Sequence, residues 1–459
     1  MKKILILILT CLFISQGPLF SQQKVWSLED CIRYAIENNL QIKQQNIQTK
    51  VQKNSLDLAK LNLLPTLNGS ASDNFSFGRT FDQSTFSYSN RNGQSNNFYL
   101  GGSLNIFNGL QNFNSIKKNK YQLLASEQDL QSIKDNIALN VALDYLQILL
   151  NKELVNVNSN QVQITQQQIT KTKKLVDAGS VARGNLLQIE AQAAQEEVSL
   201  ITVENQLETS YLNISQLLEL KTPQGFEVVV PAISIDTNAV IAGNIDEIFS
   251  NAEGIRPEVK SSEYNLTASQ YDLKIAQGGR SPHISMSHSF STGYVSTTRK
   301  VLSVDPVTFQ TITGPYSFNS QINDNVTYGV GFTMNIPILN GWQVNKRISN
   351  SRLAIQNSQY VLEGTKKTLY KNIQQAYTDA MAALKKYNAS LIAVVSTEES
   401  FRYTEQKFNV GMVTSVDYNA AKTQLLIAQS DMAQAKYEFV FKTKVLDFYK
   451  GIPLSLSSK

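Results

Sequence analysis

The residue types that most often carry enzyme chemistry are sparse in this chain. Its 459 residues include two histidines, His283 and His288, and two cysteines, Cys11 and Cys31. An odd spacing within an alternating, strand-like stretch puts the two histidines on opposite faces, so they do not form a metal-binding pair. The sequence contains no HExxH, CxxC, GxSxG or P-loop pattern. We therefore expect no enzyme, no catalytic residue, no metal and no cofactor.

Carboxylates are the remaining candidates for chemistry. The acidic pairs Glu196-Glu197 and Glu398-Glu399 lie in helical stretches, and we interpret them as solvated helix faces. Asp417 differs, because it follows Thr414 by three residues at the start of a heptad pattern. This spacing is typical of a capping box with Thr414 as N-cap and Asp417 as N3. A pore role for the same carboxylate is the alternative, and both can hold.

The first residues predict export. Lys2 and Lys3 precede the apolar run 4–13, and residues 15–21 offer a cleavage zone, so we expect a signal peptide over residues 1–21. A membrane anchor is disfavoured because a mainly apolar run of ten residues is too short to span a bilayer. Loss of both lysines lowers the formal charge from +5 to +3, which is too mild to imply nucleic acid. No later apolar run of about 18 residues exists, which excludes a helical inner-membrane protein.

The chain is a tandem repeat. Landmarks near the start recur 217 residues later, and landmarks further on recur 232 residues later, so one 15-residue insertion (232 − 217) separates two otherwise gapless copies. The insertion falls between Pro282 and Asn340. The matched landmarks are Leu28-Glu29-Asp30 with Ile245-Asp246-Glu247, Pro65 with Pro282, Asn108-Gly109 with Asn340-Gly341, and Gly179 with Gly411. We expect repeat 1 over 22–225 and repeat 2 over 226–459.

Each copy carries two segments in which apolar or aromatic residues alternate with small, uncharged ones. We predict strands at about 66–77, 98–107, 283–294 and 326–336, joined by polar loops over 78–97 and 295–325. This length and alternation are typical of a transmembrane barrel with a wet interior. A soluble antiparallel sheet with one buried face is the alternative. Four strands cannot close a barrel, because the smallest have about eight, so the channel would be shared between chains.

Long helices follow each strand pair, at about 110–176, 185–219, 342–408 and 417–449. Residues 110–176 contain neither proline nor glycine, and a continuous helix of that size would run about 100 Å. In the returning helices, apolar residues recur every seven positions, which implies a left-handed supercoil. These heptad residues are Leu186, Ala193, Leu200, Leu207 and Ile214, then Tyr418, Leu425, Met432, Phe439 and Leu446.

This duplicated order of strand pair, long helix, glycine turn and heptad helix resembles the TolC-like outer-membrane efflux protein family. The resemblance covers essentially the whole mature chain. The matching motifs are Leu28-Glu29-Asp30 with Glu37-Asn38-Asn39, the corners 336–341 (IPILNG) and 106–109 (IFNG), and the tip 408–417 (FNVGMVTSVD).

The resemblance implies a mainly α fold with a β part. In it, a homotrimer forms a 12-stranded transmembrane β-barrel that is continued by a periplasmic α-helical barrel. It implies a passive exit duct for efflux or type I secretion in the cell outer membrane, surrounded by lipid, with its helical part in the periplasm. The implied partners are a periplasmic adaptor (membrane fusion) protein and an inner-membrane pump of RND or ABC type.

The resemblance also implies roles for residues at the periplasmic tip. Asp417 matches a position that rings the pore entrance, and Asn185 is its counterpart in repeat 1. The family's arginine two residues after the tip glycine is replaced by Val413, and Arg183 lies nearby in the other copy. Residues of the two turns match the region where adaptors dock. They are Gly179, Ser180, Val410, Gly411 and Met412.

A second function remains open at this point, namely a periplasmic adaptor or coiled-coil scaffold protein of an export complex. An adaptor would need one helical hairpin flanked by compact β domains. This sequence predicts two hairpins and strands with lipid-type alternation, which favours the channel.

Overall fold

The computed structural model describes most of the chain after residue 24. The expected signal peptide, residues 1–21, lies outside the described residues. The described residues form two compact units. Unit 1 is built from segments up to residue 48, 127–260 and from 363 onward, and unit 2 is built from 49–126 and 261–362. Each unit therefore contains residues of both copies. The described residues are 25–82, 86–90, 92–222, 224–233, 235–236, 243–307 and 310–456.

Four helices in each copy correspond in length and order. Within each copy they are 11, 22, 67 and 35 residues long. In repeat 1 they are α2 Leu28–Asn38, α3 Leu40–Leu61, α4 Gln111–Asp177 and α5 Arg183–Leu217; in repeat 2 they are α6 Ile245–Ile255, α7 Pro257–Gly278, α9 Gln343–Asn409 and α10 Ser415–Tyr449. Each copy therefore has two consecutive helices that precede its strand pair.

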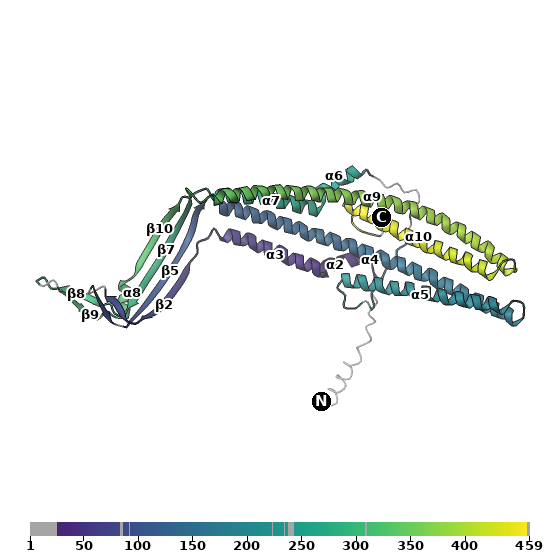
Figure 1. Cartoon of the computed structure of the whole chain (residues 1–459), viewed down its shortest axis with the longest axis horizontal. Coiled ribbons are helices and arrows are strands. Elements are labelled where there is room, and N and C mark those ends of the chain that lie inside the picture. Colours follow the sequence, from purple (N-terminus) through teal and green to yellow (C-terminus); the bar gives the residue numbers. More distant parts are fainter. Residues whose placement is uncertain are drawn as a thin grey trace, which may run out of the picture. The chain divides into compact units, whose positions relative to one another are not determined.

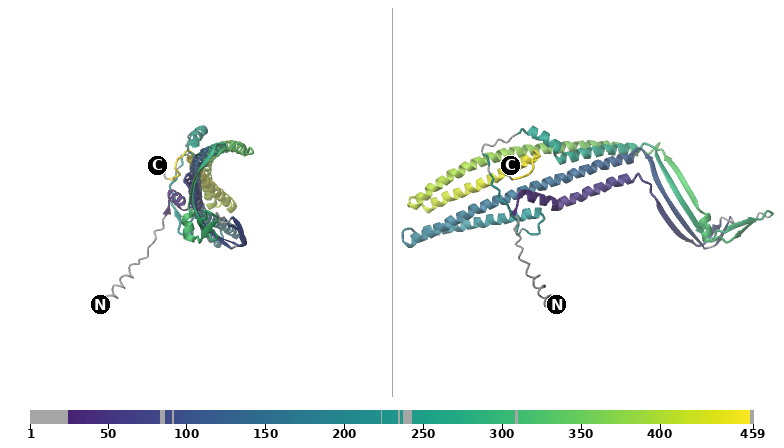
Figure 2. Two further views of the ribbon diagram at one scale, coloured as in Figure 1. Left: turned by 90° about the vertical axis from the view of Figure 1, so that its left-hand side faces the viewer. Right: turned by 180° about the vertical axis from the view of Figure 1, so that it is seen from behind.

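Local sequence explains where these helices start and how far they run. Ser27 caps α2 by accepting a hydrogen bond from the Asp30 amide, and Asn244 caps α6 through the Asp246 amide. At 1.5 Å per residue, the 67-residue helices α4 and α9 each extend about 100 Å. α5 lies alongside α4, and α10 lies alongside α9 (Figures 1 and 2). No helix within the described ranges combines the length and the apolarity needed to cross a membrane.

The main apolar core belongs to unit 1. Side chains of α2, α4, α5 and α10 pack there against a short parallel pair of strands, β1 (Val25–Trp26) and β6 (Glu227–Val228). Tyr145 of α4 is buried, and its hydroxyl donates to the Val229 carbonyl at 2.6 Å. Cys31 is buried in the same core, as expected for a small apolar residue.

One four-stranded antiparallel sheet dominates unit 2. Its order is β10-β7-β5-β2, so the adjacent strands β5 and β7 join the hairpins of the two copies (Figure 1). The strands are β2 Asn68–Ser76, β5 Gly93–Asn108, β7 His283–Val295 and β10 Thr327–Asn335. Within the described ranges, β10 and β2 each pair with one strand only, which leaves one edge of each without a partner.

The register gathers the apolar residues on one face. Leu100 lies opposite Phe290, and Phe332 lies opposite Met286. Directly paired residues share a face, so most of the apolar side chains expected on one side do lie together. Ile106 is an exception, because a bulge between Asn105 and Phe107 puts Phe107 opposite Ile284. A bulge adds one residue and reverses the alternation beyond it, which the sequence pattern did not reveal.

The connections within each strand pair, predicted as polar loops over 78–97 and 295–325, are more structured than plain loops. Repeat 1 forms a hairpin of β3 (Arg79–Asp82) and β4 (Ser87–Asn90). Repeat 2 forms a hairpin of β8 (Lys300–Val304) and β9 (Thr311–Gly314), followed by the short helix α8 (Phe318–Asp324). Ser317 caps α8 by accepting from the Ser320 amide at 3.3 Å. β5 also begins earlier than predicted, at Gly93.

Equivalent glycines at the strand-to-helix corners allow a matched test. Gly109 and Gly341 have φ of +66° and +59°, but an added Cβ at Gly109 would lie 2.3 Å from the Gly278 carbonyl oxygen, whereas Gly341 has no neighbour within 4 Å. We expect Gly341→Ala to cost about 1–2 kcal/mol from left-handed strain alone. Gly109→Ala should cost more, by roughly 1–3 kcal/mol of overpacking. Denaturant unfolding measures both losses, and equal losses would refute the steric argument.

Candidate functional site at the tips of the helical hairpins

Two glycine turns close the helical hairpins of unit 1. Gly179 follows α4 with φ of +71°, and Gly411 follows α9 with φ of +76°. Their amides donate to the carbonyls of Val176 and Phe408, at 2.9 and 3.0 Å. A left-handed glycine is the usual way to end a helix, because a Cβ is disfavoured at that φ. A left-handed glycine therefore allows the chain to reverse sharply at both tips.

The helix starts after these turns differ. Thr414 and Asp417 form the predicted capping box: the Thr414 hydroxyl accepts from the Asp417 amide, and the Asp417 carboxylate accepts from the Thr414 amide at 3.1 Å. The hydroxyl and amide of Thr414 lower the pKa of Asp417 below its ordinary value. In repeat 1 the N-cap is Ala182, which makes no side-chain cap. Repeat 2 therefore has the more firmly fixed turn.

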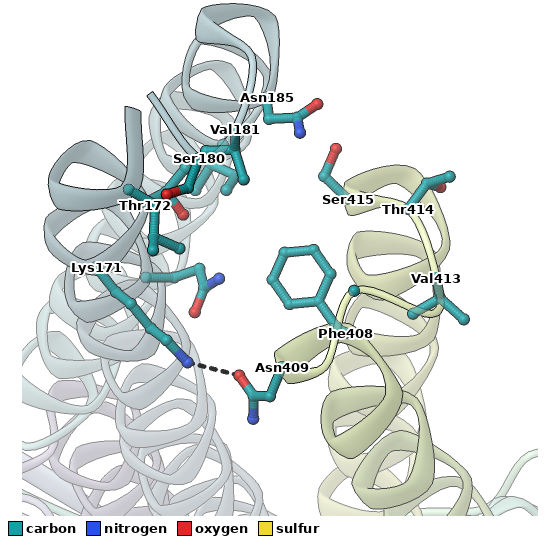
Figure 3. A pocket seen from close by; sticks show the side chains of 14 residues that line it. Lys171, Thr172, Ser180, Val181, Asn185, Phe408, Asn409, Val413, Thr414 and Ser415 are labelled. Atoms are coloured by element: carbon teal, nitrogen blue, oxygen red, sulfur yellow. Dashed lines mark hydrogen bonds between the residues drawn. The ribbon is translucent and has the colours of Figure 1, made fainter. Parts of the chain in front are cut away.

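A cavity of about 400 Å³ lies between the two tips (Figure 3). Of the residues predicted for this region, Ser180, Asn185 and Gly411 line it. The others lie outside the lining. They are Asp417, Arg183, Gly179, Val410 and Met412, and their side chains are exposed where they have one.

Two hydrogen bonds join the tips directly, and neither was predicted from the sequence. The Lys171 ammonium donates to the Asn409 side-chain oxygen at 2.6 Å (Figure 3). The Ser415 hydroxyl donates to the Gln188 side-chain oxygen at 2.6 Å. Each bond links a residue of repeat 1 to one of repeat 2, so the two hairpins of one chain are connected at the tip.

A buried polar cluster connects the hairpins further from the tip. Lys422 of α10 is 2% exposed, and Glu196 of α5 is 4% exposed. The Lys422 ammonium lies 3.2 Å from a Glu196 carboxylate oxygen, and it also donates to Thr165 and to the Gln161 carbonyl of α4. The interpretation of Glu196 as part of a solvated face is therefore wrong, although Glu197 is exposed.

Burial changes the titration of this region. Desolvation lowers the pKa of Lys422, and the neighbouring Glu196 carboxylate opposes that shift. Desolvation, together with the nearby Glu405 and Glu196, raises the pKa of Tyr418 to about 12. Tyr418 also stacks on Phe408 with 4.7 Å between ring centroids. Both Lys422 and Tyr418 are therefore fixed parts of the packed interface rather than solvated side chains.

A sequence signal for the buried pair did exist. Lys422 follows the heptad residue Tyr418 by four positions, and Glu196 follows Ala193 by three. On a helix these positions continue the same inward stripe, which apolar residues normally fill. Charged residues of opposite sign on two inward stripes were therefore the available clue.

Comparisons with known proteins agree with this architecture. The family model described as outer membrane efflux protein matches residues 31–219 and 248–443, which is most of the chain. The chain belongs to the outer membrane efflux protein family. It is thus a TolC-like efflux-family protein of the outer membrane, mainly helical with a smaller β part.

Three known proteins resemble this chain at low sequence identity. The outer membrane protein TolC of Salmonella enteritidis is 21% identical over 321 residues, which cover 70% of this chain and 62% of TolC, less than two thirds of its length. The outer membrane efflux protein BepC of Brucella suis is 19% identical over 420 residues, covering 90% of this chain and 82% of BepC. The outer membrane protein VceC of Vibrio cholerae shares the fold, with a TM-score of 0.74 at 15% identity over 92% of this chain and 96% of VceC.

The buried pair of this efflux-family protein can be tested by a double-mutant cycle. Lys422→Met leaves the Glu196 carboxylate buried without its cation, so we expect a loss of about 3–5 kcal/mol in unfolding free energy. Lys422→Met combined with Glu196→Gln removes both charges and should cost clearly less than the sum of the single losses. Unfolding of the purified chain in detergent measures all variants.

The exposed pair Lys386–Glu438 serves as the control, because its ammonium and carboxylate are 2.8 Å apart in the same unit with side chains 52% and 38% exposed. The same cycle there should give a coupling of at most about 1 kcal/mol. Strictly additive losses at Lys422 and Glu196 would show that the two charges do not depend on each other.

Proposed function

We propose that this efflux-family chain is one subunit of a homotrimeric, passive exit duct that serves efflux or type I secretion. In the proposal, three sheets close into one β-barrel in the outer membrane, and the helices continue the duct through the periplasm. Each subunit comprises the two repeats 22–225 and 226–459. The observation that carries this proposal is the four-stranded sheet of unit 2, which has one apolar face and two edges that no strand of the described residues covers.

Backbone chemistry supports the trimer. An open sheet edge exposes unpaired amides and carbonyls, which lipid cannot satisfy. β10 and β2 are the edges within the described sheet. Pairing β10 of one subunit with β2 of the next subunit removes both edges. Three copies of four strands give twelve (3 × 4), which exceeds the minimum of about eight for a closed barrel.

The two faces of the sheet fit two different solvents. On the apolar face, side chains such as Phe332 (70% exposed), Val330 and Tyr328 are uncovered in the single chain. Lipid covers such a face in a barrel. The opposite face presents Ser285, Ser287 and other small polar residues, which suit a water-filled channel without strong selection among solutes.

The tips supply a surface for a periplasmic adaptor protein. Val410 and Met412 are largely exposed on the repeat 2 turn, and Gly411 beside them lines the tip cavity. Gly179 and Ser180 occupy the repeat 1 turn. Exposed apolar side chains in a fixed turn favour contact with another protein. An inner-membrane pump of RND or ABC type would reach the duct through such an adaptor.

The assembly is tested by membrane fractionation and chemical crosslinking of the full chain in its own cells. We expect the protein in the outer-membrane fraction and a crosslinked species of three subunits, because a barrel needs more strands than one chain holds. A freely soluble periplasmic pool would favour the scaffold alternative. Monomers alone in crosslinked outer membranes would refute the trimer.

The entrance of the duct is proposed to carry its charge mainly on repeat 2. Asp417 is exposed and ionised at neutral pH, since its pKa is lowered. Its counterpart Asn185 is neutral, and Arg183, two residues earlier in the chain, adds a positive charge. Three copies of Asp417 around a narrow axis would attract cations, because charges that line a constriction reinforce one another.

Planar-bilayer conductance tests this role. Asp417→Asn keeps a side-chain oxygen for the Thr414 amide but removes the charge, so the reversal potential in a salt gradient should move toward that of a non-selective pore. Asn185→Asp adds a carboxylate at the equivalent position, so the reversal potential should move toward stronger cation preference. A reversal potential unchanged in both variants would exclude these residues from the selective entrance.

A further inference from the structure

Within the described part of the chain, no strand lies on one side of the C-terminal end of β7, and α8 occupies that place. β10 pairs with β7 only as far as Thr327 opposite Ser291, whereas β5 pairs with β7 up to Val295. The last four residues of β7, 292–295, therefore extend beyond β10. The segment that covers them belongs to the outer connection of repeat 2, which is longer than that of repeat 1 because of the 15-residue insertion.

Side chains at α8 replace the missing strand's hydrogen bonds. The buried Gln321 accepts from the Val295 amide at 3.0 Å and donates to the Val295 carbonyl at 3.1 Å. The Asn325 side chain donates to the Gly293 carbonyl at 2.7 Å. These are the backbone groups that alternate toward the β10 side of β7. Side-chain hydrogen bonds therefore hold α8 against the edge of the sheet.

The helix also extends the apolar face of the sheet. By register, Tyr294 lies on the same face as Phe290 and Met286. The ring of Phe318, the first residue of α8, packs on Tyr294 with 5.1 Å between centroids and remains 43% exposed. The surface that faces lipid in the proposed barrel therefore continues onto α8.

The apolar face turns polar at the level of Tyr294. Asn96 lies opposite Tyr294, and on the same face the Gln94 side chain donates to the Asp73 carboxylate at 3.0 Å. Beside α8, the Tyr316 hydroxyl donates to Asp324 at 3.0 Å, and the Lys300 ammonium lies 3.5 Å from the same carboxylate. Aromatic rings next to charged and amide groups are characteristic of the boundary between acyl chains and headgroups.

We propose that α8 is a lipid-contacting segment of the channel wall, with Phe318 and Tyr294 at the acyl-chain boundary of the outer leaflet and Lys300, Tyr316 and Asp324 among its headgroups. The inference rests on the proposed function, since the sheet must first face lipid. The partner is a membrane lipid, because the α8 surface is continuous with the apolar face and ends where that face becomes polar. The insertion thus extends the wall of the duct.

Tryptophan fluorescence of the full chain tests this placement. Phe318→Trp is purified and reconstituted into phosphatidylcholine vesicles with or without brominated acyl chains, with the parent chain, which keeps Trp26 and Trp342, as the baseline. We expect the added fluorescence to fall by more than about a third in brominated vesicles and to resist aqueous acrylamide, as for an interfacial aromatic residue. Tyr294→Trp is a second reporter of the same boundary if Phe318→Trp does not assemble.

Two controls separate the possible outcomes. Phe332→Trp reports the middle of the apolar face and should be quenched by brominated lipid, whereas Val307→Trp, beyond β8, should be quenched by acrylamide. If Phe332→Trp is not quenched by lipid, the proposed barrel placement fails as a whole. If it is quenched but Phe318→Trp responds only to acrylamide, α8 faces water. If Phe318→Trp responds to neither quencher, a second copy of the chain covers it. Either of the last two results overturns the lipid contact alone.

Discussion

Every backbone amide and carbonyl in contact with lipid must find a hydrogen-bond partner, and in the proposed barrel the β part of this protein depends on that constraint. β5 and β7 satisfy it by joining the hairpins of the two repeats within one chain. The outer end of β7 satisfies it with the side chains of Gln321 and Asn325. The remaining edges, on β10 and β2, have no partner within the described chain, and their pairing between subunits is what the proposed trimer provides.

The helical part meets a different requirement. Helices of 67 residues satisfy their own backbone, so their arrangement depends on side-chain packing. Heptad residues such as Ile214 and Leu446 supply apolar contacts, while Lys422 and Glu196 place an ion pair inside the same interface. A buried pair adds little net stability, but it penalises every register in which the two charges do not meet. We interpret it as a device that fixes how α5 and α10 align.

The two copies share the same order of strands and long helices, but they differ at the tips of their helical hairpins. Both turns keep a left-handed glycine, because the chain must reverse sharply there. Only repeat 2 has the Thr414–Asp417 capping box, and Ala182 and Asn185 stand at the equivalent positions of repeat 1. A carboxylate at a helix start stabilises that start and also presents charge to solvent, so one substitution changes both local order and electrostatics.

The sequence by itself determined the features that depend on neighbouring residues. Alternation located the four strands, the absence of glycine and proline over 110–176 predicted an unbroken helix, and the Thr414–Asp417 spacing predicted the capping box. Each of these follows from local backbone and side-chain geometry. The resemblance to TolC-like channels likewise came from motifs whose order and spacing survive in the sequence.

Only the tertiary structure decided what depends on residues far apart in the chain. The bulge that puts Phe107 opposite Ile284, the burial of Glu196 against Lys422, and the bond from Lys171 to Asn409 each involve both repeats. The use of α8 as a substitute for a strand depends on where β10 stops pairing with β7. Residue type and spacing do not fix such contacts, because they arise only when separate elements pack and their polar groups must be satisfied together.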